Sequence, residues 1–341
     1  MTDPVSGTTD DASDEPAAVE AGVAKKDPGV FKVFDAVLAA EPLDVNPWLA
    51  GRYTPDQALL ERLFQDAISA GGGITQQSGR AASSLDAWIA HELRRGGFPS
   101  DDVWPRPSEP RVLPGALGPL AARLKTVLQL LEKAEQSGDW GSNLKSVKSG
   151  PANLTPGPLR NAIMGLRKDL PGGGMRESRL LGRFYTKQVD VLVSSWQHGP
   201  DVIVSTKTMF SSYNNNRNNR YEETLGEATN LRDRYPLAAM GYVFLLRQDV
   251  HNPADPDDVT FRRMHDLISR LRKPDGPYDA TMLLIGDWDP QKAELHHVGT
   301  DPAAPTLGSG QFFADIINAV LDRTPFDEHR ELRRRREAGS A

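Results

Sequence analysis

The longest apolar run in the chain, LAAMGYVFLL at residues 237–246, constrains the fold more than any other stretch. Its ten residues are about half of what a membrane-spanning helix needs. A short continuous apolar run is instead typical of a β-strand that is covered on both faces, as in sheets with helices packed on each side. The run therefore predicts a buried strand in a layered α/β protein.

The composition excludes several other classes of protein. The chain has 341 residues, of which 38% are hydrophobic and 25% charged, as expected for a globular protein of one large domain or two ordinary ones. It contains no cysteine, which rules out structural disulfides and cysteine-ligated zinc. The N-terminus is acidic and polar, unlike a secretory signal. We therefore expect a cytoplasmic protein with no membrane partner.

Shifts in composition divide the chain into five predicted segments. The first, residues 1–28, is a disordered acidic tail with seven acidic residues against Lys25 and Lys26. A helical region follows over 29–140, where apolar residues recur at helical spacing in 56–70, 83–97 and 117–138. The remaining segments are a polar connector (141–157), an α/β domain (158–325) and an Arg-rich tail, expected to be frayed, at 326–341.

Within the α/β domain, the order of the expected elements is more informative than any one of them. A short helix at 158–170 precedes three short strands, RLLGRFYTK, VDVLVSSW and DVIVSTKT. An Asn-rich loop (211–219), a helix (220–234) and the apolar strand (236–247) come next. A further helix, strand and helix, over 257–272, 278–288 and 311–323, complete the alternation.

Basic residues gather just before the strand pair VDVLVSSWQHGPDVIVSTKT (189–208). Residues 142–187 contain nine Lys or Arg against two acids, which indicates either a solvated helix face or a site for a polyanion. Five Asn and two Arg lie within 213–221, where they supply hydrogen-bond donors for bases and phosphates, although a plain polar loop has the same composition. The candidate DNA contacts are Lys187, Asn216, Arg217 and Arg220.

Charged residues interrupt the two apolar strands of this hairpin. Asp190 lies on the first strand, and Ser205 and Lys207 lie at the end of the second. Residues i and i+2 of a strand share a face, and a cross-strand partner lies within roughly 5 Å, so the three side chains are expected on one face. Burying such charges is costly unless they are paired or bind a metal. Asp190 is therefore either a functional acid or half of an ion pair with Lys207 or Lys187.

The stretch 158–250 resembles the PD-(D/E)xK nuclease superfamily in its αβββαβ order and in two short motifs. These motifs are QVD, which contains Asp190, and STK, which contains Lys207. The resemblance implies a restriction-endonuclease-like core with a mixed central sheet. It also implies metal-dependent endonuclease activity on DNA, with Mg²⁺ or Mn²⁺ as the cofactor. By this resemblance, Asp190 is the metal-binding acid and Lys207 the catalytic lysine. Ser205 departs from the pattern, because the family expects Asp or Glu there.

A second carboxylate must then come from elsewhere in the chain. Glu177 precedes the first strand, whereas Glu222 and Glu223 begin the helix after the Asn-rich loop. We favour Glu177 and then Glu223 as metal ligands; the alternative is that these glutamates are surface acids at the ends of elements, as is favourable at a helix N-terminus. Ser205 is either hydrogen-bonded to a metal-bound water or a sign of a degenerate site.

Two other functions fit the sequence. The main alternative is a non-catalytic nucleic-acid-binding protein on the same fold with a degenerate site. A third possibility is a small-molecule α/β enzyme, but the sequence contains no cofactor motif that supports it. Cleavage of both strands of a duplex would call for two active sites, hence a homodimer, although no residue argues for one.

Overall fold

The computed structural model describes residues 31–106 and 178–340, apart from short gaps, and a few residues between 127 and 137. The gaps are 71–73, 75–77, 196–197, 252–253, 275, 290 and 303. The predicted acidic tail, the connector, the helix at 158–170 and most of the helix at 117–138 lie outside the described residues.

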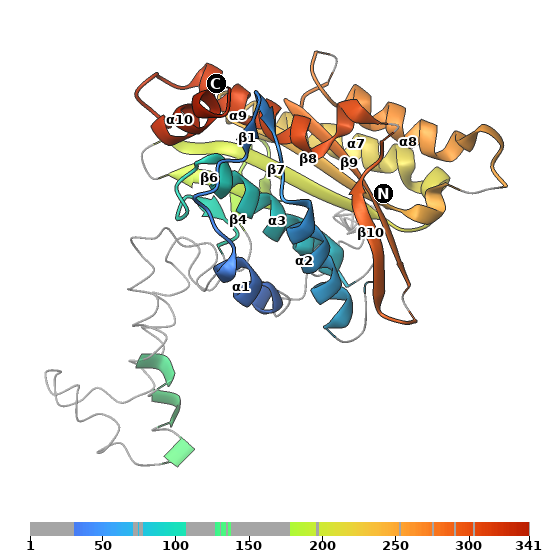
Figure 1. Ribbon diagram of the computed structural model, residues 1–341, viewed down its shortest axis with the longest axis horizontal. Helices are drawn as coiled ribbons and strands as arrows, with labels where there is room; N and C mark the ends of the chain where they lie inside the picture. Colours follow the sequence, from blue (N-terminus) through green and yellow to red (C-terminus); the bar gives the residue numbers. More distant parts are fainter. Residues whose placement is uncertain are drawn as a thin grey trace, which may run out of the picture.

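A six-stranded mixed sheet, with strand order β10-β9-β8-β7-β6-β3, forms the centre of the α/β fold (Figure 1). Its strands are β3 (Val103–Trp104), β6 (Val191–Ser195), β7 (Gly199–Met209), β8 (Ala239–Arg247), β9 (Ala280–Asp289) and β10 (Glu294–Thr300). Strands β7, β8 and β9 are parallel to one another, whereas the other pairings are antiparallel. Strand β8 is the long apolar run and is buried along all but its last residue, which confirms the prediction of a strand covered on both faces.

Helices cover both faces of the sheet. One core joins the sheet to α1 (Phe31–Ala40), α2 (Gln57–Ser69), α3 (Arg80–Gly96) and α9 (Ser309–Arg323). The other core joins it to α7 (Tyr213–Arg232) and α8 (Val259–Arg270). The helical N-terminal region therefore shares a hydrophobic core with the sheet. Along β7, Val202 and Val204 belong to the first core and Ile203 to the second, so strand alternation turns Ser205 and Lys207 toward α7.

The strands before β7 form an antiparallel meander. β4 (Ser178–Leu181) pairs with β5 (Thr186–Val189), and β5 continues through a bend at Asp190 into β6, which pairs with β7. The prediction of one strand over RLLGRFYTK was wrong, because the chain reverses at Gly182 within it. A Cβ on that glycine would lie 2.1 Å from the Asn230 side chain, so only glycine permits the close approach of this turn to α7.

Two other predictions need correction. The stretch SSYNNNRNN is not a loop: α7 begins at Tyr213, whose hydroxyl donates a 2.5 Å hydrogen bond to Asp249 and fixes the first turn. The Arg-rich end is not frayed, because α10 (Arg330–Ala338) buries Leu332 completely. Arg335 secures that helix by a 2.7 Å hydrogen bond to the carbonyl of Leu43.

Shorter elements complete the described fold. They are β1 (Trp48–Leu49), β2 (Arg52–Tyr53) and the 3₁₀ turns Gln248–Val250, Pro256–Asp258 and Pro305–Leu307. None of the described helices has the length and apolar character needed to span a bilayer.

Candidate functional site

Asp190 and the end of β7 meet at the bend between β5 and β6. The first registered pair of β6 and β7 is Val191 opposite Val204, which places Asp190 one step further along, beside Ser205 and Thr206. The Asp190 Oδ2 accepts a 2.9 Å hydrogen bond from the Thr206 backbone N–H. The structure therefore brings the predicted acid to the strand that carries Ser205 and Lys207.

A carboxylate from α7 lies against the serine that departs from the nuclease pattern. Ser205 Oγ donates a hydrogen bond to Oε1 of Glu227, and both residues are 2% exposed. The helix thus places a carboxylate next to the strand position where the sequence has none. Sequence reasoning missed Glu227, although its position four residues after Glu223 puts it on the same helix face.

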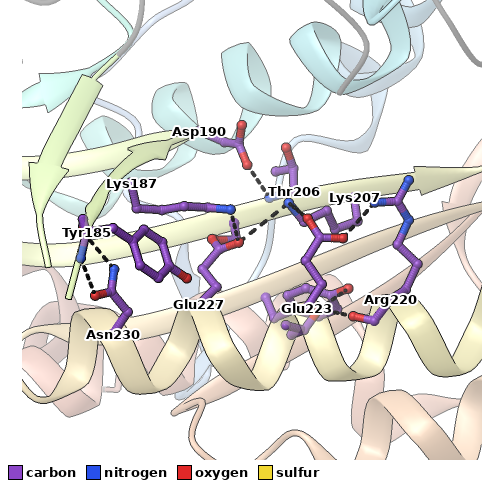
Figure 2. A network of polar contacts seen from close by, with 12 residues as sticks. Tyr185, Lys187, Asp190, Thr206, Lys207, Arg220, Glu223, Glu227 and Asn230 are labelled. Carbon is purple, nitrogen blue, oxygen red and sulfur yellow. Dashed lines mark hydrogen bonds and ion pairs between the residues drawn. The ribbon is translucent and has the colours of Figure 1, made fainter. Parts of the chain in front are cut away.

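Two lysines converge on the same carboxylate from neighbouring strands (Figure 2). The Lys187 Nζ, from β5, lies 2.8 Å from Glu227 Oε2. The Lys207 Nζ, from β7, lies 3.6 Å from that oxygen and 3.8 Å from Glu223 Oε1. These four side chains form an acid–lysine cluster: Lys187, Lys207, Glu223 and Glu227. Glu227 is the most buried of them, and both ammonium groups lie within ion-pair distance of it.

Glu223 occupies the more open end of the cluster, where Arg220 Nη1 contacts its Oε2 at 2.7 Å. Burial alone would raise the pKa of Glu223, but the charge of Lys207 and the hydrogen bond from Arg220 outweigh it and lower that pKa. Burial would likewise lower the pKa of Lys187, but the neighbouring Glu227 raises it. Both side chains are therefore ionised at neutral pH.

Two tyrosines close the inner side of the cluster. The Tyr242 hydroxyl lies 3.2 Å from Thr224 Oγ1, and the Tyr278 hydroxyl donates a 3.3 Å hydrogen bond to the Thr224 carbonyl. Burial, chiefly, raises the pKa of both tyrosines, so both stay neutral. The charged groups thus lie against buried, poorly solvated tyrosine side chains, where electrostatic interactions are stronger than at an open surface.

The other predicted site residues lie in the first turns of α7, outside the described chain, or at the acid–lysine cluster itself. Asn216 and Arg217 are in the first turns of α7, where the Arg217 Nε donates a 3.3 Å hydrogen bond to Asn218. Glu177 lies outside the described residues. Lys187, predicted as a DNA contact, is part of the acid–lysine cluster itself.

The donor atoms at this site suit a hard cation. Mg²⁺ prefers oxygen ligands and needs only one or two protein carboxylates, because it keeps several waters. Glu227 Oε2 is buried and lies 2.8 Å from the Lys187 Nζ and 3.6 Å from the Lys207 Nζ. Among the described residues, no three acids or histidines are grouped closely enough to enclose a metal. A partly hydrated Mg²⁺ held by one or two carboxylates fits this arrangement, whereas a metal enclosed by protein ligands does not.

No protein family model, curated protein or solved structure matches this chain. Its function must therefore be inferred from the fold and the site.

Proposed function

We propose that the protein is a metal-dependent DNA endonuclease of the PD-(D/E)xK type, built on a restriction-endonuclease-like core. The observation that carries the proposal is Glu227, which supplies from α7 the carboxylate that Ser205 lacks, beside Lys207. The antiparallel strands β6 and β7, followed by α7 and the parallel strand β8, support the proposal as a part of the order that the resemblance implies.

Each charged group has a role under this proposal. Asp190 and Glu227 would hold Mg²⁺ or Mn²⁺, with Glu223 as a further ligand. When bound, the metal supplies an acidified water and a positive charge next to the scissile phosphate. Lys207 orients the attacking water or contacts the phosphate, and Lys187 holds Glu227 in place by an ion pair.

The balance of charges at the site supports the binding of a metal and DNA together. The ion pairs at this site combine two carboxylates with three cationic groups: Glu223, Glu227, Lys187, Lys207 and Arg220. Two further acids, Asp190 and Asp86, contact β7 at Thr206. A divalent cation would add two positive charges to this partly buried site, which the phosphates of a DNA strand offset. The proposal therefore predicts that DNA tightens metal binding, and the metal tightens DNA binding, by the same factor.

One observation favours the alternative function, a non-catalytic nucleic-acid-binding protein. Both glutamates already have cationic partners, which are Lys187, Lys207 and Arg220. In that case the cluster would be a structural ion-pair network, and DNA would bind without any requirement for a metal.

A cleavage assay separates the two functions. Wild-type protein is incubated with single-stranded and duplex DNA in Mg²⁺, Mn²⁺ or EDTA, beside Asp190→Asn, Lys207→Met and Glu227→Gln. Glu222→Gln is the matched control, because Glu222 is a solvent-exposed acid on the same helix. We expect metal-dependent cleavage by the wild type and the control, and a loss of about 100-fold or more in the three site variants.

Two results would reject the nuclease proposal. One is the absence of cleavage on every substrate, and the other is cleavage that the three site variants do not reduce relative to Glu222→Gln. Salt-dependent DNA binding in EDTA without cleavage would establish the alternative instead.

A further inference from the structure

The β4–β5 hairpin exposes large apolar side chains next to the acid–lysine cluster. The Phe184 side chain, at the turn, is 68% exposed, and its neighbours Leu181 and Tyr185 are also among the exposed large hydrophobic residues. The hairpin segment 178–189 carries Arg179, Arg183 and Lys187 and no acidic residue. Exposed aromatic rings among positive charges are typical of protein surfaces that bind single nucleic-acid strands.

Hydrogen bonds from α7 and from the turn after it hold this hairpin in place. The Asn230 Oδ1 accepts hydrogen bonds from the backbone N–H groups of Phe184 (2.8 Å) and Tyr185 (3.3 Å), and its Nδ2 donates to the Tyr185 carbonyl at 3.1 Å. The Tyr235 hydroxyl donates to the Leu181 carbonyl at 2.9 Å. The exposed rings therefore project from an ordered turn, so binding through them loses little conformational entropy.

The Phe184 ring, at the turn, is covered only in part by its neighbours. Arg183 lies over the Phe184 ring, with its guanidinium carbon 5.0 Å from the ring centroid, and is itself ion-paired with Asp233. The exposure of Phe184 shows that the guanidinium covers only part of the ring. A nucleobase on the remaining face would stack on the ring, with the arginine charge behind it.

The same side of α7 contacts both the hairpin and the proposed active site (Figure 2). Asn230, which binds the turn, follows Glu227 and Glu223 on the same side of α7, and Lys187 of the hairpin reaches Glu227 directly. Seven residues of helix separate Asn230 from Glu223, about 10 Å along the axis. A DNA strand covers that distance in about three nucleotides at the duplex rise of 3.4 Å, and in fewer when extended.

We propose that the β4–β5 hairpin is a stacking platform for an unpaired base of the strand whose backbone enters the acid–lysine cluster. The substrate class is therefore single-stranded DNA, or DNA with unpaired nucleotides at the cleavage point. A paired base in a duplex offers only its edges, whereas an unpaired base offers its face to Phe184. The position of the backbone rests on the proposed nuclease function. Because one active site suffices for one strand, this substrate does not require a homodimer.

The test measures DNA binding without cleavage. Fluorescence anisotropy of a labelled single-stranded oligonucleotide, in EDTA, is recorded for the wild type, Phe184→Ala and Phe184→Trp. Phe326→Ala is the matched control, because Phe326 is 81% exposed and also lies under an arginine, Arg333, at 5.3 Å. Loss of one stacked base is worth about 1–3 kcal/mol, so Phe184→Ala should weaken binding about 5- to 150-fold. Phe184→Trp should bind as the wild type does, and Phe326→Ala within about 2-fold of it.

Blunt duplex of the same sequence should bind more weakly than the single strand and should not respond to Phe184→Ala. Equal losses in Phe184→Ala and Phe326→Ala, or no loss in either, would overturn the stacking platform. So would tighter binding of the blunt duplex than of the single strand. If the wild type cuts DNA and Phe184→Ala cuts and binds equally well, the nuclease function stands and the platform fails. If binding depends on Phe184 but no metal supports cleavage, the platform stands and the nuclease function fails.

Discussion

The contact between Ser205 and Glu227 predicts that the carboxylate can be moved from the helix to the strand. Ser205 donates its hydroxyl hydrogen bond to Glu227, so an Asp at position 205 would place its own carboxylate in nearly the same space. Lys207 lies two residues further along the same strand face and stays within reach of it. Glu227→Ser alone should therefore be damaging, and Ser205→Asp should compensate for it.

The burial of these groups sets the expected magnitude. Removing one partner of a fully buried ion pair costs about 3–5 kcal/mol. The Lys187 and Lys207 side chains are 23% and 18% exposed, so water compensates part of the lost charge in Glu227→Ser. We expect this variant to lower the free energy of unfolding by about 2–3 kcal/mol. Ser205→Asp alone should cost about 1–3 kcal/mol, because it sets a second buried carboxylate against Glu227.

The double variant Ser205→Asp/Glu227→Ser restores one carboxylate between the two lysines. Urea unfolding of the four proteins should give a favourable coupling free energy of about 2 kcal/mol, and metal-dependent cleavage should return at least in part. Glu222→Ser combined with Ser205→Asp is the control, and its effects should add. If the double variant is only as stable as the two single effects predict, within about 0.5 kcal/mol, the exchange of carboxylates is refuted.

Three further predictions test other parts of the fold. Burial first, and then two neighbouring arginines, lower the pKa of His91 to about 4. Because an unfolded histidine binds a proton near pH 6.5, the free energy of unfolding should fall by about 3 kcal/mol between pH 6.5 and 4, and His91→Leu should flatten this part of the pH profile in urea titrations. Gly182→Ala would press a Cβ against the Asn230 amide, so it should cost about 1–3 kcal/mol in urea unfolding and weaken single-strand binding in the anisotropy assay, although Phe184 is intact. Asp279→Asn should lower the free energy of unfolding by about 3 kcal/mol at neutral pH. Hydrogen bonds from two arginines and a lysine overcome burial and lower the pKa of Asp279, so the wild type loses this contribution only below about pH 4 and the two proteins should converge there in acid titrations.

Strong local patterns predicted much of the fold. The apolar run of β8 and the spacing of apolar residues in α2, α3 and α9 each needed only a short window of sequence, because burial on one or two faces determines those residues directly. Strand alternation likewise predicted that Ser205 and Lys207 share a face. The start of α7 could not be predicted in this way, since Asn usually competes with helical hydrogen bonds and the contact of Tyr213 with Asp249 spans 36 residues.

The missed parts of the site depend on which face of α7 meets the strands. Glu227 reaches Ser205 across 22 residues of sequence, and Asn230 reaches Phe184 across 46. A local pattern holds no information on how a helix is rotated about its axis once it packs. Glu223 was among the candidates because it was expected near the start of a helix, whereas the rotation of α7 is what brings Glu227 deeper than Glu223.

The rotation of α7 also couples the site to the hairpin. Glu223, Glu227 and Asn230 follow one another at i, i+4 and i+7, so a single stripe of the helix holds the acids against the lysines and the hairpin turn in place. Beside the apolar contacts of α7 in the core, ion pairs and amide hydrogen bonds join α7 to β7 and to the β4–β5 hairpin. A ligand that draws Lys187 or Lys207 away from Glu227 therefore weakens the same contact that orients the hairpin. Occupancy of the acid–lysine cluster should consequently alter hydrogen exchange at the Phe184 and Tyr185 amides, which Asn230 protects.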